Sequence, residues 1–150
     1  MANQQNEEVA RRTFEVFNTG DMSVIDETVA DGAVSHDPAQ PEELSGPEGQ
    51  KQLTQMYRTA YPDLQVTVEE QFSDDDLVCI RWKAEGTNDG ELAGMPPTGK
   101  SISITGISID KVQDGKVVEA WNHWDNAGMM QQLGIGAEAG AAAGGGRFSQ

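Results

Sequence analysis

The segment VVEAWNHWD, residues 117–125, places two indoles, an imidazole and a carboxylate next to one another. Alternate side chains of a strand share one face, so Trp121, His123 and Asp125 would point the same way. A carboxylate partly removed from water is suited to general-base catalysis, with His123 as an orienting or donating group. In a second interpretation, Asp125 or Asn126 only caps a helix over NAGMMQQLG. The sequence leaves both interpretations open.

Two further side chains could take part in catalysis. His36, in SHDP, could transfer protons near neutral pH, or it could be a turn residue before Asp37 and Pro38. Arg81 could hold an enolate or ester oxygen. Alternatively, Arg81 is solvated or forms an ion pair with Glu85 across the pleat.

Large apolar side chains could line a binding pocket. Trp82, Trp121, Tyr57 and Met95 suit an aromatic ligand, although such side chains are equally common in an ordinary core. The segment GMPPTGK, residues 94–100, lacks the spacing of a phosphate-binding loop, and its two prolines remove backbone donors. We therefore expect it to form a rigid rim beside the pocket.

Composition narrows the class of ligand. The 150 residues suffice for one domain, and the formal net charge of −15 with a pI of about 4.2 argues against nucleic acids and anionic membranes. The single cysteine, Cys79, cannot form an intramolecular disulfide, and no Cys/His cluster has zinc-site spacing. We expect a small hydrophobic or aromatic ligand, no metal and no cofactor. No segment resembles a signal peptide or a membrane span, so we expect a cytoplasmic protein.

Periodicity predicts the elements that must position these residues. Apolar spacing predicts helices over about 7–18, 21–29 and 46–61, and from Pro62 the period falls to 2, which is typical of strands. The turns SDDD and QDGK predict hairpins, and a short helix is expected after Asp125. The pattern predicts an α+β domain over 1–134, with three helices packed on one face of a curved antiparallel sheet around an internal pocket. Residues 135–150 are Gly/Ala-rich and are expected to be a flexible tail.

The isoleucines of KSISITGISIDKV change phase along the predicted strand. Ile102 and Ile104 are in one phase of the alternation, whereas Ile107 and Ile109 are in the other. A β-bulge at Gly106 would restore one continuous apolar face and would bend the sheet around the pocket.

Several segments together resemble the SnoaL-like polyketide cyclases, a branch of the nuclear-transport-factor-like superfamily. The resemblance is carried by SHDP, by the region from YPDLQVTV to SISITGISI with its GxPPTGK loop, and by GKVVEAWNHWDNAGMMQQLG. It implies a cone-shaped fold, a homodimer, and metal-free aldol ring closure of an aromatic polyketide ester. It also implies Asp125 as acid/base, His36 as a pocket histidine, and Trp82 and Asn88 as pocket contributors. Asn88 departs from the histidine that many members have after the threonine of EGTNDG, so either the substrate or the activity differs.

Two other functions remain open from the sequence. An epoxide hydrolase or isomerase on the same fold would need a second pocket carboxylate or a tyrosine beside Asp125. A small-molecule binding module without catalysis would be consistent with Asn88.

Overall fold

The computed structural model describes residues 1–40 and 43–135. Within these residues the helices are α1 (Gln4–Thr19), α2 (Ser23–Thr28), α3 (Gly46–Ala60) and α4 (Asn126–Leu133). The described strands are β1 (Val29–His36), β2 (Leu44–Ser45), β3 (Gln65–Asp74), β4 (Leu77–Thr87), β5 (Ser101–Gln113) and β6 (Lys116–Trp124). The predicted flexible tail lies outside the described residues except for Ile135.

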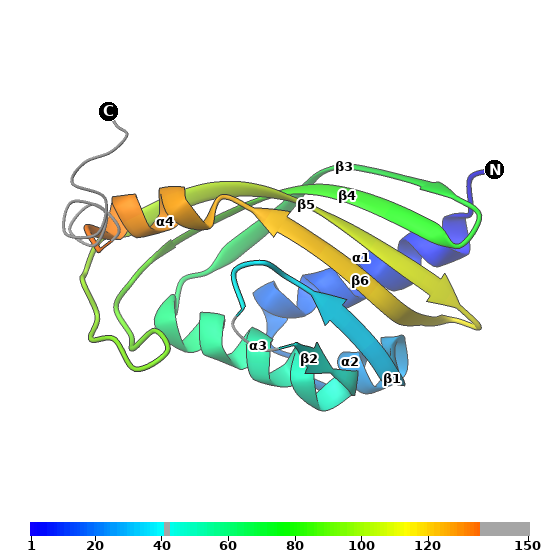
Figure 1. The fold of residues 1–150 in the computed structure, drawn as a ribbon, viewed down its shortest axis with the longest axis horizontal. Coiled ribbons are helices and arrows are strands. Elements are labelled where there is room, and N and C mark those ends of the chain that lie inside the picture. Colours follow the sequence, from blue (N-terminus) through cyan, green and yellow to red (C-terminus); the bar gives the residue numbers. More distant parts are fainter. Residues whose placement is uncertain (41–42, 136–150) are drawn as a thin grey trace.

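The described strands form one six-stranded sheet in the order β2-β1-β6-β5-β4-β3. All neighbours are antiparallel except β1 and β6, which are parallel. Figure 1 shows α1, α2 and α3 on one side of the curved sheet, with α4 following β6 at one end. The predicted α+β cone is therefore confirmed, although the sequence interpretation included neither β2 nor the parallel pairing of β1 with β6.

Local sequence explains where the long helices begin and end. The side chain of Asn3 accepts a hydrogen bond from the backbone N–H of Asn6 and caps α1. Gly20, with a φ of +74°, ends that helix in the left-handed conformation that glycine adopts without strain. Pro47 stands in the first turn of α3, and Pro62 follows its end.

The inner face of β5 differs from the prediction. Ile107 and Ile109 are 48% and 37% exposed on the outer face. The register between β5 and β4 is continuous along the whole pairing, so there is no bulge at Gly106. The buried face of β5 carries instead an unbroken alternation of Ile102, Ile104, Gly106, Ser108 and Asp110.

Gly106 has a packing role rather than a conformational one. Its φ is not among the positive values of the described glycines. A Cβ at this position would lie 2.4 Å from Cζ2 of Trp82 and 2.7 Å from Cβ of Trp124, so only glycine leaves room for the indole. The register shifts of the described sheet lie elsewhere: between Val29 and Val34 in β1, between Val68 and Glu70 in β3, and between Lys111 and Val112 where β5 pairs with β6.

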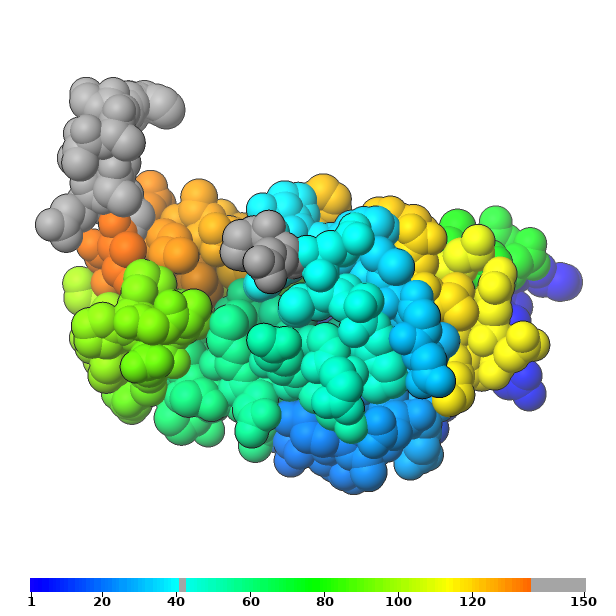
Figure 2. Space-filling view, turned by 60° about the horizontal axis from the view of Figure 1, so that its bottom comes forward, coloured from blue at the N-terminus to red at the C-terminus, as the bar shows by residue number. Residues whose placement is uncertain are grey.

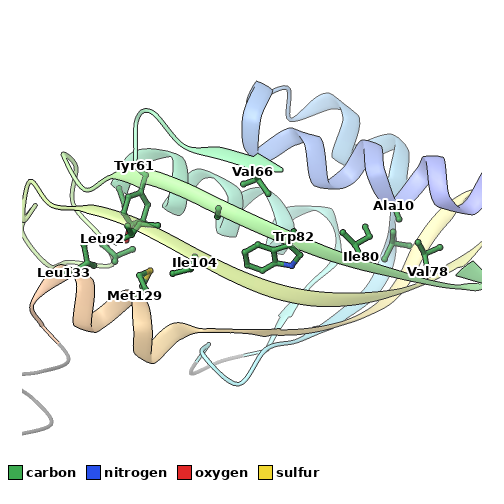
Figure 3. Packing of buried hydrophobic residues seen from close by; sticks show 14 of the residues in the cluster. Ala10, Tyr61, Val66, Val78, Ile80, Trp82, Leu92, Ile104, Met129 and Leu133 are labelled. Carbon is green, nitrogen blue, oxygen red and sulfur yellow. The ribbon is translucent and has the colours of Figure 1, made fainter. Parts of the chain in front are cut away.

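Buried apolar side chains extend along the inner face of the sheet. In Figure 3 they run from Tyr61 at one end, through Trp82 in the middle, to Val78 at the other end. The inward side chains of β4 are those that the alternation predicted: Val78, Ile80, Trp82 and Ala84. In the described part of the chain no helix is long and apolar enough to cross a membrane.

Candidate active site

A mostly apolar cavity lies between the inner face of the sheet and the helices. Its volume of about 140 Å³ is many times the roughly 10–15 Å³ that one buried water needs on the same measure. Side chains of α1, α3, β1, β4, β5 and β6 line it. Figure 2 shows the face on which α3, β1 and β2 lie over the centre of the molecule. A predominantly apolar cavity with a few polar groups is typical of a small-molecule site.

Asp110 places a carboxyl group in this cavity. It lies on the inner face of β5, is 8% exposed, lines the cavity, and pairs with Ala120 of β6, which lines the cavity too. None of the described residues donates a hydrogen bond to its side chain. Because burial penalises the charged form, the pKa of Asp110 is raised to about 7. Near neutral pH this group can therefore both accept and return a proton.

A chain of hydrogen bonds crosses four strands beside Asp110. Trp82 Nε1 donates to Ser108 Oγ at 3.0 Å, and Ser108 Oγ donates to Asn122 Oδ1 at 2.8 Å. Asn122 Nδ2 then donates to Ser35 Oγ at 3.0 Å.

The direction of this chain follows from the donor groups. An indole N–H can only donate, so Ser108 accepts from Trp82 and directs its own proton to Asn122. The amide of Asn122 then presents its NH₂ to Ser35. Ser35 lines the cavity, and within the described structure its own proton has no acceptor. The chain therefore ends in a hydroxyl donor that is free to bind a ligand.

A second polar group lies on the wall formed by α3 and the end of β1. Trp124 Nε1 donates to Asp37 Oδ2 at 3.0 Å, and the Trp124 ring meets that of Tyr57 edge-on, with centroids 6.1 Å apart. Gln40 Nε2 donates to the Tyr57 hydroxyl at 3.4 Å. Burial, and then the negative charge of Asp37, raise the pKa of Tyr57 above its usual value. Tyr57 is therefore a neutral phenol, able to donate to a ligand.

The predicted strand face of β6 points away from the cavity. Trp121 and His123 share one face of β6, and Asp125 directly follows the strand. The cavity is lined from β6 by Val117 and, beyond the register shift, by Ala120, Asn122 and Trp124. Asp125 is exposed, and it accepts a hydrogen bond of 2.8 Å from the backbone N–H of Gly128 as the N-cap of α4. The structure therefore shows the capping interaction and does not bring Asp125 or His123 into the cavity.

His36 also lies on the outer side. Its Nε2 is 2.7 Å from a carboxylate oxygen of Glu119, and its Nδ1 is 3.0 Å from one of Glu43. Its ring stacks on Trp121, with centroids 5.7 Å apart. The contact between His36 and Trp121 was not predicted from the sequence. Neither residue lines the cavity.

Arg81 is exposed on the outer face of β4. It forms an ion pair with Glu70 of β3, with its Nε 2.8 Å from the carboxylate oxygen, whereas Glu85 pairs with Lys83. The predicted partner was therefore wrong. The guanidinium does not line the cavity.

Asn88 and Met95 belong to the connection between β4 and β5. Asn88 is buried, and its side chain donates to the carbonyls of Ala60 and Gly90 and accepts from the N–H and hydroxyl of Thr98. All the hydrogen-bonding positions of its amide are used within the protein. Met95 packs against the core through the same connection. Of the predicted pocket residues, the cavity is lined by Trp82 and Tyr57.

Sequence reasoning missed the polar residues that do line the cavity. The missed residues are Thr13, Ser35, Asp37, Gln50, Tyr61, Ser108, Asp110 and Asn122. The inward direction of two of them follows from the register between β4 and β5, in which Asp110 pairs with Val78 and Ser108 pairs with Ile80. Among the described residues, no group of three or more His, Cys, Asp or Glu side chains could hold a metal ion.

Known proteins are similar to this chain in both sequence and fold. The chain is 29% identical over 134 residues to aklanonic acid methyl ester cyclase DauD of Streptomyces sp. (strain C5), covering 85% of this chain and 80% of the relative. The crystal structure of IdmH from Streptomyces antibioticus matches with a TM-score of 0.74 and 34% identity, over 87% of this chain and 99% of that one.

Another solved structure shows the fold alone. TsrD from Streptomyces laurentii matches with a TM-score of 0.79 at 22% identity, over 90% of this chain and 98% of that chain. The family model described as SnoaL-like polyketide cyclase matches residues 7–133, which span every described helix and strand except the first turn of α1. The chain therefore belongs to the SnoaL-like polyketide cyclase family.

Proposed function

We propose that this chain catalyses an aldol-type ring closure within one molecule of a polyketide-like ester. Family membership supports a cyclase role, and the observation that carries the proposed mechanism is the buried carboxyl of Asp110 in the cavity. Its pKa of about 7 suits proton transfer in both directions. Neither a metal nor a cofactor is required, because a carbon between two carbonyl groups is already acidic.

The reaction needs only one proton shuttle. The Asp110 carboxylate removes a proton from the carbon between two carbonyl groups, and the electron pair remains as an enolate. The enolate carbon attacks a carbonyl carbon of the same molecule, a C–C bond forms, and the attacked oxygen becomes an alkoxide. The alkoxide takes the proton from Asp110, so the product has the same atoms as the substrate and the carboxylate is regenerated.

Donors on the cavity wall would stabilise the negative charge that moves through this reaction. Ser35 ends the hydrogen-bond chain from Trp82, and each preceding bond polarises its hydroxyl in the donating direction. A donor that is already in place when charge develops lowers the barrier without reorganisation. We assign this role to Ser35.

The decisive experiment compares Asp110→Asn with Asp125→Asn. Both substitutions are nearly isosteric, and asparagine also caps helices well. Turnover of aklanonic acid methyl ester and a panel of related polyketide methyl esters is measured, together with melting temperature. We expect Asp110→Asn to lose about two to four orders of magnitude in rate while staying folded. Asp125→Asn should keep both its rate and its melting temperature.

The same pair of variants tests the assignment expected from the sequence, with Asp125 as the base and His123 and His36 orienting the substrate. A folded Asp125→Asn variant that binds ligand without converting it, beside an active Asp110→Asn variant, would support that assignment. The outward position of these side chains favours Asp110.

Epoxide hydrolysis is a second candidate function. The sequence identified no second carboxylate or tyrosine near the base, but the cavity contains both, in Asp37 and Tyr57. Hydrolysis of a panel of cyclic epoxides, with no turnover of polyketide esters, would favour this function. A ligand-induced rise in melting temperature with no turnover of either class would favour a binding module.

We also propose that two copies pair through the outer face of the sheet. Phe72 and Ile109 are exposed there, and Cys79 and Trp121 complete a row of paired strand positions across β3, β4, β5 and β6. Large apolar side chains in a contiguous row are typical of an interface.

A further inference from the structure

Tyr61 has a buried hydroxyl group that the protein itself does not use. The residue follows α3, is 2% exposed, and contributes to the cavity lining. Its hydroxyl is a buried side-chain group with no hydrogen-bond partner among the described residues. Buried hydroxyls are almost always paired because an unpaired one costs free energy. A phenylalanine would fill the same space without that cost.

The hydroxyl keeps its proton. Burial raises the pKa of Tyr61 to about 12, so at neutral pH the group is a neutral donor. Tyr57, four residues earlier and within α3, also lines the cavity. The end of α3 thus contributes two phenol side chains to the cavity lining.

Tyr61 lies far along the cavity from Asp110. A Cβ at Gly86 of β4 would be 3.0 Å from Cβ of Tyr61, so Tyr61 packs beside Gly86. Asp110 of β5 pairs with Val78, which lies on β4 as Gly86 does. Positions 78 and 86 differ by eight residues, which correspond to roughly 26 Å measured along a strand. Figure 3 shows Tyr61 and Val78 at opposite ends, with Trp82 between them.

We propose that Tyr61 donates a hydrogen bond to an oxygen at the end of the substrate remote from the reacting carbon. The site would then select elongated, fused-ring or extended polyketides with a ketone or quinone oxygen at that end. This inference rests on the proposed function for its substrate class. Tyr61 is in this view a specificity-determining residue and takes no part in proton transfer.

Removing a hydroxyl that is paired only in the complex should stabilise the free protein and weaken ligand binding. Tyr61→Phe removes an unpaired polar group from the free protein, so the melting temperature should rise by about 2–5 °C. The same variant should bind an oxygen-bearing ligand about 5- to 10-fold more weakly. A purely structural tyrosine would lose stability instead. Tyr57→Phe is the matched control for stability, because its hydroxyl already has a partner in Gln40 and its removal should give no such rise.

Two probes test whether Tyr61 donates a hydrogen bond to an oxygen of the ligand. Anthraquinone-2-carboxylic acid methyl ester has quinone oxygens, and the matching anthracene ester lacks them; both are titrated by quenching of tryptophan fluorescence. Tyr61→Phe should weaken binding of the quinone and leave binding of the anthracene ester unchanged. An equal loss with both probes, a lower melting temperature, or no preference of the wild-type protein for the quinone would overturn the inference. Full turnover by Asp110→Asn would refute Asp110 as the base, and no turnover of any ester by the wild-type protein would refute the proposed function. Neither result would change the outcome of this binding experiment.

Discussion

The indole of Trp82 lies so close to Gly106 that a Cβ there would be 2.4 Å from the ring. This contact lets the Trp82 N–H reach Ser108 and start the hydrogen-bond chain that ends at Ser35. The glycine is therefore part of the positioning of the site, although it has no functional group of its own.

Gly106→Val should destabilise the fold by about 1–3 kcal/mol or more, because the added side chain overlaps the ring of Trp82 in a packed core. Chemical denaturation measures the change. Gly32→Val is a suitable control, since nothing lies within 4 Å of a Cβ at that exposed position of β1. Equal stability of Gly106→Val and the wild-type protein would show that the indole can move aside.

Asp110 should make the protein less stable as the pH rises from about 4 to about 7. Its pKa is raised from 3.8 to about 7 in the folded state, so the folded protein binds this proton more tightly than the unfolded chain. The stability present below pH 4 is lost as the pH rises through 7 and changes no further above it. The increase in the free energy of unfolding caused by Asp110→Asn should therefore be on the order of a few kcal/mol larger at pH 8 than at pH 4. Urea unfolding of both proteins at the two pH values measures this difference, and a constant difference would contradict the assignment.

Ser35→Ala should lower the rate of ring closure by about 100-fold, because it removes a preorganised donor from the developing oxyanion. Its melting temperature should change little, since the hydroxyl accepts a single hydrogen bond, from Asn122. Ser45→Ala is the neighbouring control, because the Ser45 side chain makes no capping hydrogen bond to α3. Equal rates of these two variants would remove Ser35 from the mechanism.

Light scattering at micromolar concentration should show a homodimer of the wild-type protein. Ile109→Glu should shift it toward a monomer, because the substitution puts a charge in the exposed apolar row of an already acidic protein. Glu85→Gln lies on the same face at the far end of β4 and should leave the dimer intact. A monomeric wild-type protein would refute the proposed interface.

The helices and hairpins could be predicted because their signals are local. The spacing of Phe14 and Phe17, the glycine after α1 and the DG turn between β5 and β6 each depend on a few neighbouring residues. The alternation within β4 and within β6 was also readable from the sequence. Periodicity, however, separates the two faces of a strand without saying which face is covered.

The site could not be predicted because it depends on pairing between strands. The hydrophobicity of Ile107 and Ile109 suggested that their side chains face the core. The register of β5 with β4 instead places Ser108 and Asp110 inward. That register is set across the long connection of residues 88–100, and a connection of this length does not fix the pairing of its two strands as a tight hairpin turn does. Apolar side chains on an outer face, which suit a protein interface, led to the wrong choice.

Asn88 holds the β4–β5 connection against the carbonyl of Ala60, the residue just before Tyr61. The backbone just before Tyr61 is thus held by a connecting segment at the end of a helix, whereas Asp110 and Ser108 belong to β5, which pairs with a strand on each side. Connecting segments accept insertions, deletions and substitutions far more readily than central strands do. Changes in the β4–β5 connection could therefore alter the length of ligand that such a protein accepts, while the end of the cavity that holds Asp110 stays unaltered.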